Sequence, residues 1–129
     1  MDDRKFNILI VEDSLPQVLL FKEVLKSDNY ALDIALSGKT ALEKVNNEPF
    51  SLILLDIVLP DISGFKLLSI LRQDEKTANI PVIMISAKNE SSSIKKTLEM
   101  GAMDYIVKPI DPDILNAKVK NLLTYYKYK

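Results

Sequence analysis

Five short apolar runs alternate along this chain with five segments in which apolar residues recur at helical spacing. The runs occupy residues 6–11, 30–35, 52–56, 80–85 and 104–107, and the periodic segments occupy about 16–27, 38–46, 65–72, 91–100 and 112–126. Short connections between alternating strands and helices demand parallel strands with right-handed crossovers and helices on both faces of the sheet. We therefore expect an α/β fold, with one doubly wound, five-stranded parallel sheet and five helices in a single domain spanning residues 1–129.

The third apolar run, from Leu52 to Leu55, leads directly into a single carboxylate, Asp56. A run this apolar indicates a strand buried on both faces, in the middle of a parallel sheet and under helices. Asp56 is then the last residue of a central strand, at the carboxyl edge where open α/β sheets bind their ligands. Taken alone, Asp56 could equally be a cap for the turn that follows it.

The composition excludes several classes of site. There is no His and no Cys, so imidazole or thiolate metal ligands, His bases and disulfides are excluded. The 17 Lys and Arg against 18 Asp and Glu give a net charge of -1, without the basic excess of a nucleic-acid or anionic-membrane surface. No apolar segment approaches the ~20 residues of a membrane span, and the charged N-terminus is unlike a signal peptide. We therefore expect a cytoplasmic protein that binds neither membranes nor, directly, nucleic acid.

Side chains with useful chemistry follow four of the five predicted strands. They are Glu12 and Asp13 after the first strand, Asp56 at the end of the third, Ser86 after the fourth and Lys108 after the fifth. Because the carboxyl ends of parallel strands meet at one edge of the sheet, we expect these residues to be neighbours. Singly, the acid pair could cap a helix, Ser86 could cap a strand end, and Lys108 could form a plain ion pair.

Three carboxylates at one sheet edge would repel one another unless their pKa values rise or a cation neutralises them. With oxygen ligands only, the natural cation is Mg²⁺, which accepts one or two carboxylates and shares its other positions with water and phosphate oxygens. Lys108 can bind phosphate as a point charge, and Ser86 can donate a hydrogen bond to an anionic oxygen. Together these groups predict a phosphoryl-transfer site with the Asp56 carboxylate, on the central strand, as the nucleophile.

The chain resembles the receiver domain of two-component response regulators over essentially its whole length. Four segments carry the resemblance: residues 11–14 (VEDS), 54–64 (LLDIVLPDISG), 84–87 (MISA) and 101–109 (GAMDYIVKP). Each segment alone is moderately specific for this family. All four together, in this order and on the expected elements, are very specific for it. The resemblance implies a flavodoxin-like, three-layer architecture with the strands in the order 2-1-3-4-5.

The resemblance implies that Asp56 accepts a phosphoryl group from a histidine kinase or a histidine phosphotransfer protein. It implies that Mg²⁺ is held by Asp13 directly, by Glu12 through water, by Asp56 and by the backbone carbonyl of Val58. Val58 and Lys88 occupy the positions that, in the family, tune how fast the phosphoryl group is lost. Such a domain is not an enzyme in the usual sense, because it catalyses only its own phosphorylation and dephosphorylation.

The resemblance also assigns a switch. Ser86 and Lys108 would contact the phosphoryl group, the Lys108–Pro109 peptide bond would be cis, and Tyr105 would turn inward when Ser86 engages phosphate. The face made by the helix at 91–100, the strand at 104–107 and the last helix would then control a downstream partner or a fused output domain. A homodimer through that face is one expected assembly. The polar helix at 91–100 is expected to pack weakly and to shift easily.

Three alternatives use the same fold. An aspartate-based phosphohydrolase would also use Asp56, Mg²⁺ and Lys108, but such enzymes usually carry a second carboxylate where this chain has Val58. A flavin or nucleotide binder would need a phosphate-binding loop after the first strand, where Glu12 and Asp13 would repel phosphate unless a metal intervened. A receiver-like interaction domain that works without phosphorylation is the more serious alternative, although such domains usually lack part of the residue set present here.

Overall fold

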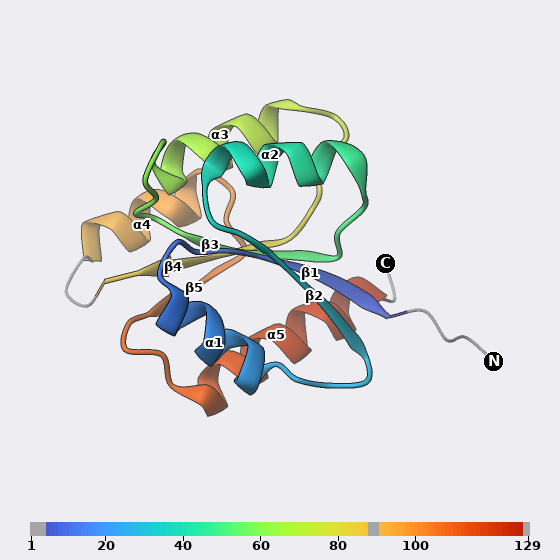
Figure 1. Cartoon of the computed structure of the whole chain (residues 1–129). Coiled ribbons are helices and arrows are strands. Elements are labelled where there is room, and N and C mark those ends of the chain that lie inside the picture. The colour runs from blue at the N-terminus through green and yellow to red at the C-terminus, as the bar shows by residue number, and fades with distance from the viewer. Residues whose placement is uncertain (1–4, 88–90, 128–129) are drawn as a thin grey trace.

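The computed structural model describes residues 5–87 and 91–127 (Figure 1). Strands and helices alternate throughout, which confirms the predicted α/β fold. The elements in chain order are β1 (Phe6–Val11), α1 (Leu15–Val24), β2 (Tyr30–Ala35), α2 (Gly38–Asn47), β3 (Leu52–Asp56), α3 (Gly64–Gln73), β4 (Val82–Ser86), α4 (Ser91–Glu99), β5 (Asp104–Val107) and α5 (Pro112–Lys127).

The five strands form one parallel sheet in the order β2-β1-β3-β4-β5, as predicted. β3 lies between β1 and β4, and all of its residues are buried. The register sets Asp56 opposite Ile85 in β4, and Ser86 opposite Val107 in β5. The residue that follows β5, Lys108, therefore reaches the same carboxyl edge as Asp56.

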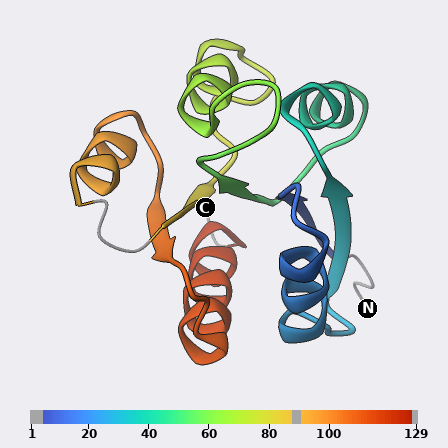
Figure 2. The same ribbon diagram turned by 60° about the vertical axis from the view of Figure 1, so that its left-hand side comes forward.

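The helices lie in two layers, with α1 and α5 on one face of the sheet and α2, α3 and α4 on the other (Figures 1 and 2). Because successive side chains of a strand point to opposite faces, the strands contribute to both layers. In β1, Ile8 and Ile10 pack into the core beneath α1 and α5, whereas Leu9 and Val11 pack into the core beneath α2 and α3. Two covered faces explain why these strands are continuous apolar runs rather than alternating ones.

Two element boundaries differ from the prediction. α1 ends at Val24, a few residues before the expected end near residue 27. β4 begins at Val82 instead of residue 80, because Pro81 has no N–H for the ladder and the Ile80 N–H donates to the Thr77 carbonyl at 3.1 Å.

α5 begins as the sequence predicted, with Asp111 as its N-cap and Pro112 at its first position. The Asp111 side chain accepts a hydrogen bond from the Asp113 N–H at 2.9 Å. Leu115 and Val119 are fully buried against the sheet. α5 has 16 residues, and no helix in the described part of the chain is long and apolar enough to cross a membrane.

Candidate functional site

The Asp56 carboxylate lies at the carboxyl end of β3, where the residue is only 4% exposed. The Val58 N–H donates to its Oδ1 at 2.8 Å, which is the local turn contact that an Asp makes in many loops. Lys108 Nζ donates to its Oδ2 at 2.6 Å from the end of another strand, and this contact is not local. The cap of the following helix is Ser63, which accepts from the Lys66 N–H at 3.1 Å. Asp56 is therefore a buried carboxylate that makes the local turn contact with one oxygen and pairs with Lys108 through the other.

Glu12 is also buried, 1% exposed at the end of β1. Its Oε2 accepts from the Ser14 N–H at 3.1 Å. Its Oε1 lies 3.3 Å from Lys108 Nζ, but the contact lacks hydrogen-bond geometry, so Oε1 has no hydrogen-bond partner among the described residues. Burial, reinforced by the neighbouring Asp56 carboxylate, raises the pKa of Glu12 to about 7, against the opposing effects of Ser14 and Lys108. A cation entering beside this carboxyl would favour its charged form.

Lys108 connects these two carboxyl groups. Burial acts to lower the pKa of Lys108, but its hydrogen bond to Asp56 and the charges of Asp56 and Glu12 outweigh burial, so the pKa is raised. The Lys108 N–H donates to the Ser86 carbonyl at 2.8 Å, which holds the chain against β4 just past the end of β5. The Lys108–Pro109 peptide bond is cis, the isomer that the resemblance implied.

Ser86 ends β4, next to the central strand, and is 1% exposed. Within the described residues, its Oγ has no hydrogen-bond partner. Asp13 follows Glu12 at the same edge, and its side chain is exposed. The Val58 side chain points into solvent, 71% exposed, while its backbone N–H contacts Asp56. Lys88, the second expected tuning position, lies outside the described residues.

Tyr105 lies half-buried on the edge strand β5. Lys118 of α5 lies over its ring, with Nζ 4.8 Å from the ring centroid, and donates to the Tyr105 carbonyl at 2.9 Å. The same Nζ forms an ion pair with Asp104 at 2.8 Å. Through Lys118, these three contacts connect Tyr105 and its neighbour Asp104 to α5.

Sequence reasoning missed the structural parts played by Asp61, Arg72 and Lys118. Asp61 looked like an ordinary turn residue, but its carboxylate accepts two backbone hydrogen bonds from α2. Arg72 looked like a helix end, but its guanidinium donates to three backbone carbonyls in other segments. One sequence feature bears on Asp61. The first turn of α2 contains no acidic residue of its own, and a carboxylate from another segment is favourable at the N-terminus of a helix.

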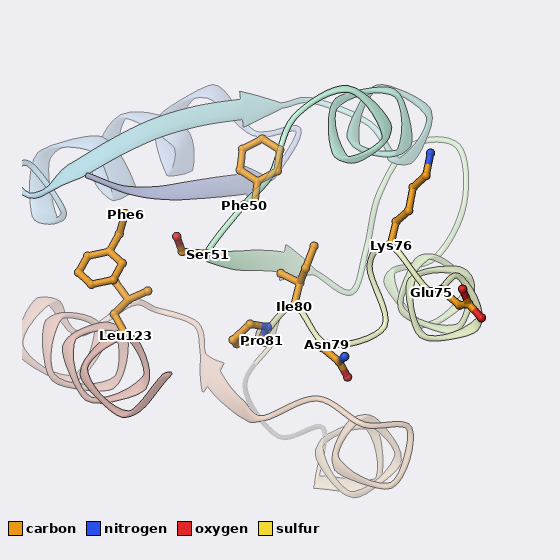
Figure 3. A pocket seen from close by; sticks show the side chains of 9 residues that line it. All are labelled: Phe6, Phe50, Ser51, Glu75, Lys76, Asn79, Ile80, Pro81 and Leu123. Atoms are coloured by element: carbon orange, nitrogen blue, oxygen red, sulfur yellow. The ribbon is translucent and has the colours of Figure 1, made fainter. Parts of the chain in front are cut away.

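A surface hollow of about 380 Å³ lies at the opposite, amino edge of the sheet (Figure 3). Its lining includes Phe6 at the start of β1, Ser51 just before β3, Pro81 just before β4 and Leu123 of α5. Glu12, Asp56, Ser86 and Lys108 are not among its lining residues. The polar groups with candidate chemistry therefore lie at the other edge, away from this hollow.

Comparison with known proteins agrees with the fold. The family model of the response regulator receiver domain matches residues 8–120, and the chain belongs to this family. Receiver domains are in general signalling modules rather than enzymes. The match covers all four segments that carried the resemblance in the sequence.

Two relatives show the range of proteins that carry such a domain. The chain is 40% identical over 117 residues to the response regulator ArlR of Staphylococcus epidermidis, covering 91% of this chain and 52% of that protein. It is 35% identical over 118 residues to the response regulator PleD of Caulobacter vibrioides, covering 92% of this chain and 26% of that protein. The chain thus spans about half or less of the length of these curated relatives.

Solved structures of receiver domains have the same fold as this chain. A CheY-like receiver domain protein from Methanospirillum hungatei superposes with a TM-score of 0.86 at 31% identity, covering 96% of this chain and 98% of that one. The receiver domain of a signal transduction histidine kinase from Syntrophus aciditrophicus superposes with a TM-score of 0.87 at 31% identity, covering 96% and 94%.

Proposed function

We propose that this chain is a phosphorylation-dependent signalling switch in which Asp56 accepts a phosphoryl group from a histidine kinase or a histidine phosphotransfer protein. The observation that carries the proposal is the buried Asp56 carboxylate at the end of the central strand, paired with Lys108 Nζ at 2.6 Å. One carboxylate oxygen attacks phosphorus, the P–N bond of the phosphohistidine breaks, and its electron pair returns to the imidazole. These 129 residues contain no His, so the phosphohistidine belongs to a partner or to another segment.

Lys108 and Ser86 are suited to contact the transferred group. The Lys108 ammonium has three N–H donors, so it can bind a phosphoryl oxygen while it remains near the carboxylates. The Ser86 hydroxyl is buried and has no hydrogen-bond partner among the described residues. It can therefore donate a hydrogen bond to a phosphoryl oxygen without breaking a contact to another described residue.

The donor groups at this edge fit Mg²⁺. No group of three acidic side chains in the described parts of the chain forms a ready metal cage, but Mg²⁺ takes few protein ligands and keeps several waters. The buried Glu12 Oε1 has no hydrogen-bond partner there, and Asp13 presents an exposed carboxylate beside it. Asp13, Glu12 through water, Asp56 and the Val58 carbonyl would hold the ion. When bound, it would neutralise negative charge on the phosphoryl oxygens.

The output would run through Tyr105 to the surface made by α4, β5 and α5. Movement of Ser86 toward a phosphoryl group would vacate space that the Tyr105 ring can fill. Exposed apolar side chains occur in all parts of this surface, with Leu98 in α4 at 44%, Met103 just before β5 at 45% and Ile114 in α5 at 47% exposure. They support its use by a downstream partner, by an attached output module or in a homodimer, with no direct nucleic-acid contact.

The test is a phosphorylation assay followed by intact mass spectrometry. With Mg²⁺ and a small phosphodonor such as acetyl phosphate, the protein should gain one acid-labile phosphoryl group, and EDTA should prevent the gain. Asp56→Asn should abolish it, whereas the matched control Asp33→Asn, at the edge strand β2, should keep it.

Labelling of Asp56→Asn at the wild-type level would overturn the assignment of the phosphoacceptor. Wild-type protein that gains no phosphoryl group under these conditions would favour the alternative, a receiver-like interaction domain that works without phosphorylation.

A further inference from the structure

The loop between β3 and α3, residues 57–63, controls the backbone that faces the Asp56 carboxylate. The Val58 N–H donates to Asp56 Oδ1 at 2.8 Å, and the Val58 carbonyl is one of the proposed Mg²⁺ ligands. A shift of this loop would therefore move a hydrogen-bond donor and a metal ligand together. The contacts that fix the loop therefore determine how closely the Val58 N–H and carbonyl keep their positions before phosphoryl transfer.

The end of the loop nearest α3 is held by backbone contacts. The Gly64 N–H donates to the Ile57 carbonyl at 2.6 Å. A Cβ at Gly64 would meet the Asp56 carbonyl oxygen, and it would lie 2.7 Å from the Ile57 Cα. α3 thus begins in direct contact with the end of β3. These contacts do not involve the middle of the loop.

The middle of the loop is held by Asp61. Its Oδ1 accepts from the Gly38 N–H at 2.9 Å and its Oδ2 accepts from the Lys39 N–H at 2.8 Å, at the first two positions of α2. α2 already has its own cap, Ser37, which accepts from the Thr40 N–H at 3.2 Å. Asp61 is 23 residues from Gly38 in sequence, so its two hydrogen bonds join the loop to a distant helix.

Steric contact adds to this attachment. A Cβ at Gly38 would lie 2.5 Å from the Ile62 side chain, so the loop approaches the start of α2 as closely as only a glycine permits. The loop is exposed at Val58, Pro60 and Asp61, and the Asp61 carboxylate attaches this exposed part of the loop to α2.

We propose that Asp61 is a positioning residue for the phosphoacceptor site, which orients the Val58 backbone toward Asp56 and Mg²⁺ by anchoring the β3–α3 loop to the N-terminus of α2. The proposal rests on the proposed function of Asp56 and deepens it. Asp61 itself touches neither the phosphoryl group nor the metal. It acts on the site through residues 57–61, which connect Asp61 to the Val58 N–H that donates to Asp56.

The test compares Asp61→Ala and Asp61→Asn with Ser37→Ala, which removes a cap from the same helix without touching the loop. Mg²⁺ affinity is measured by titration calorimetry, and amide hydrogen exchange at Val58 is measured by NMR. In Asp61→Ala, Mg²⁺ affinity should fall about 10-fold, the lower end of the losses that follow removal of groups supporting a metal site. The Val58 amide should exchange faster, because the loop opens more often.

Asp61→Asn retains one acceptor oxygen and should give an intermediate result on both measurements. Ser37→Ala should reduce the stability of the fold but leave Mg²⁺ affinity and Val58 exchange at wild-type values. A residue that merely caps α2 would give the same result as Ser37→Ala, so matching behaviour of Asp61→Ala and Ser37→Ala overturns the proposal. Wild-type protein that binds no Mg²⁺ overturns it as well.

Neither measurement requires phosphorylation, which separates this proposal from the proposed function. Wild-type protein that binds Mg²⁺ but takes no phosphoryl group would overturn the phosphoacceptor function alone. The two measurements on the Asp61 variants would still decide whether Asp61 positions the loop.

Discussion

Asp56 and Glu12, the two buried carboxyl groups of the site, differ in the number of hydrogen bonds that each accepts. Both oxygens of Asp56 accept hydrogen bonds, from Val58 and from Lys108. Glu12 uses one oxygen for the Ser14 N–H, and its other oxygen is buried near Lys108 without hydrogen-bond geometry. Burial without full compensation penalises the charged form of Glu12, which is why its pKa rises to about 7. Without a bound cation, the charge of this cluster near neutral pH therefore depends on one proton at Glu12.

Glu12→Gln should change how stability depends on pH when divalent cations are absent. Folding raises the pKa of Glu12 from 4.5 to about 7, so its stabilising contribution is complete below about pH 4.5 and is lost as the pH rises through 7. Gln does not titrate. Between about pH 5 and 8, wild type should lose on the order of 2 kcal/mol of unfolding free energy relative to the variant. Urea unfolding across this range measures the difference, and parallel profiles would contradict the prediction.

At the scale of elements, two of the glycines set how closely the helices on one face approach the sheet and its loops. Gly64 begins α3 against the backbone of Asp56 and Ile57, which cannot move without disturbing β3. Gly38 begins α2 against the Ile62 side chain, whose far end can rotate away. The two positions therefore differ in what a methyl group would displace, and only the methyl group at Gly64 would displace the backbone of β3.

Gly64→Ala should destabilise the fold by about 1–3 kcal/mol, the range for overpacking against a rigid neighbour. Gly38→Ala is the matched control and should lose less, because the Ile62 side chain can adjust and Ala favours a helix more than Gly does. Urea unfolding of both variants measures the two losses. The prediction would be contradicted if Gly38→Ala lost as much unfolding free energy as Gly64→Ala, or more.

Thr97 of α4 is a fully buried polar residue, and its hydroxyl donates to the Ile94 carbonyl at 2.7 Å. Its Lys96 Nζ lies 4.3 Å from the centre of the Phe65 ring, which connects α4 to the first turn of α3. Leu98 is exposed. That this helix packs weakly and shifts on phosphorylation stays a prediction.

Across the whole molecule, Arg72 connects three segments of the chain. Its guanidinium donates to the Ala78 carbonyl at 3.2 Å and to the Ile80 carbonyl at 2.9 Å, just before β4. It also donates to the Gly101 carbonyl at 3.2 and 2.9 Å, in the turn after α4 where Gly101 has a φ of +99°. One planar group with several fixed donors thus ties α3 to both connections that flank α4 and β4.

Arg72→Lys should therefore destabilise the protein although it keeps the charge. A single ammonium cannot reach the Ala78, Ile80 and Gly101 carbonyls together, and the loss should be about 2 kcal/mol. The neighbouring exposed Gln73→Ala is the control, with an expected change within about 0.5 kcal/mol. Thermal or urea unfolding measures both, and wild-type stability in Arg72→Lys would contradict the prediction.

The sequence by itself determined the fold class, the strand–helix alternation and the edge of the sheet where chemistry gathers. These follow from local patterns: apolar runs mark strands buried on both faces, and parallel strands end at one edge. Asp56, Ser86 and Lys108 could be assigned to that edge because each lies at or next to a strand end. Two limits were missed, the end of helix α1 at Val24 and the start of strand β4 at Val82. The second depends on Pro81, which has no N–H to donate to the ladder.

Only the tertiary structure decided how these groups pair. The 2.6 Å contact of Lys108 with Asp56 joins residues 52 positions apart, and the Asp61 anchor on Gly38 joins residues 23 positions apart. The raised pKa of Glu12 depends on its burial and on the neighbouring Asp56 carboxylate, which follows it by 44 positions in the sequence. No local pattern contains these distances, because they arise only when the sheet brings separate segments of the chain together.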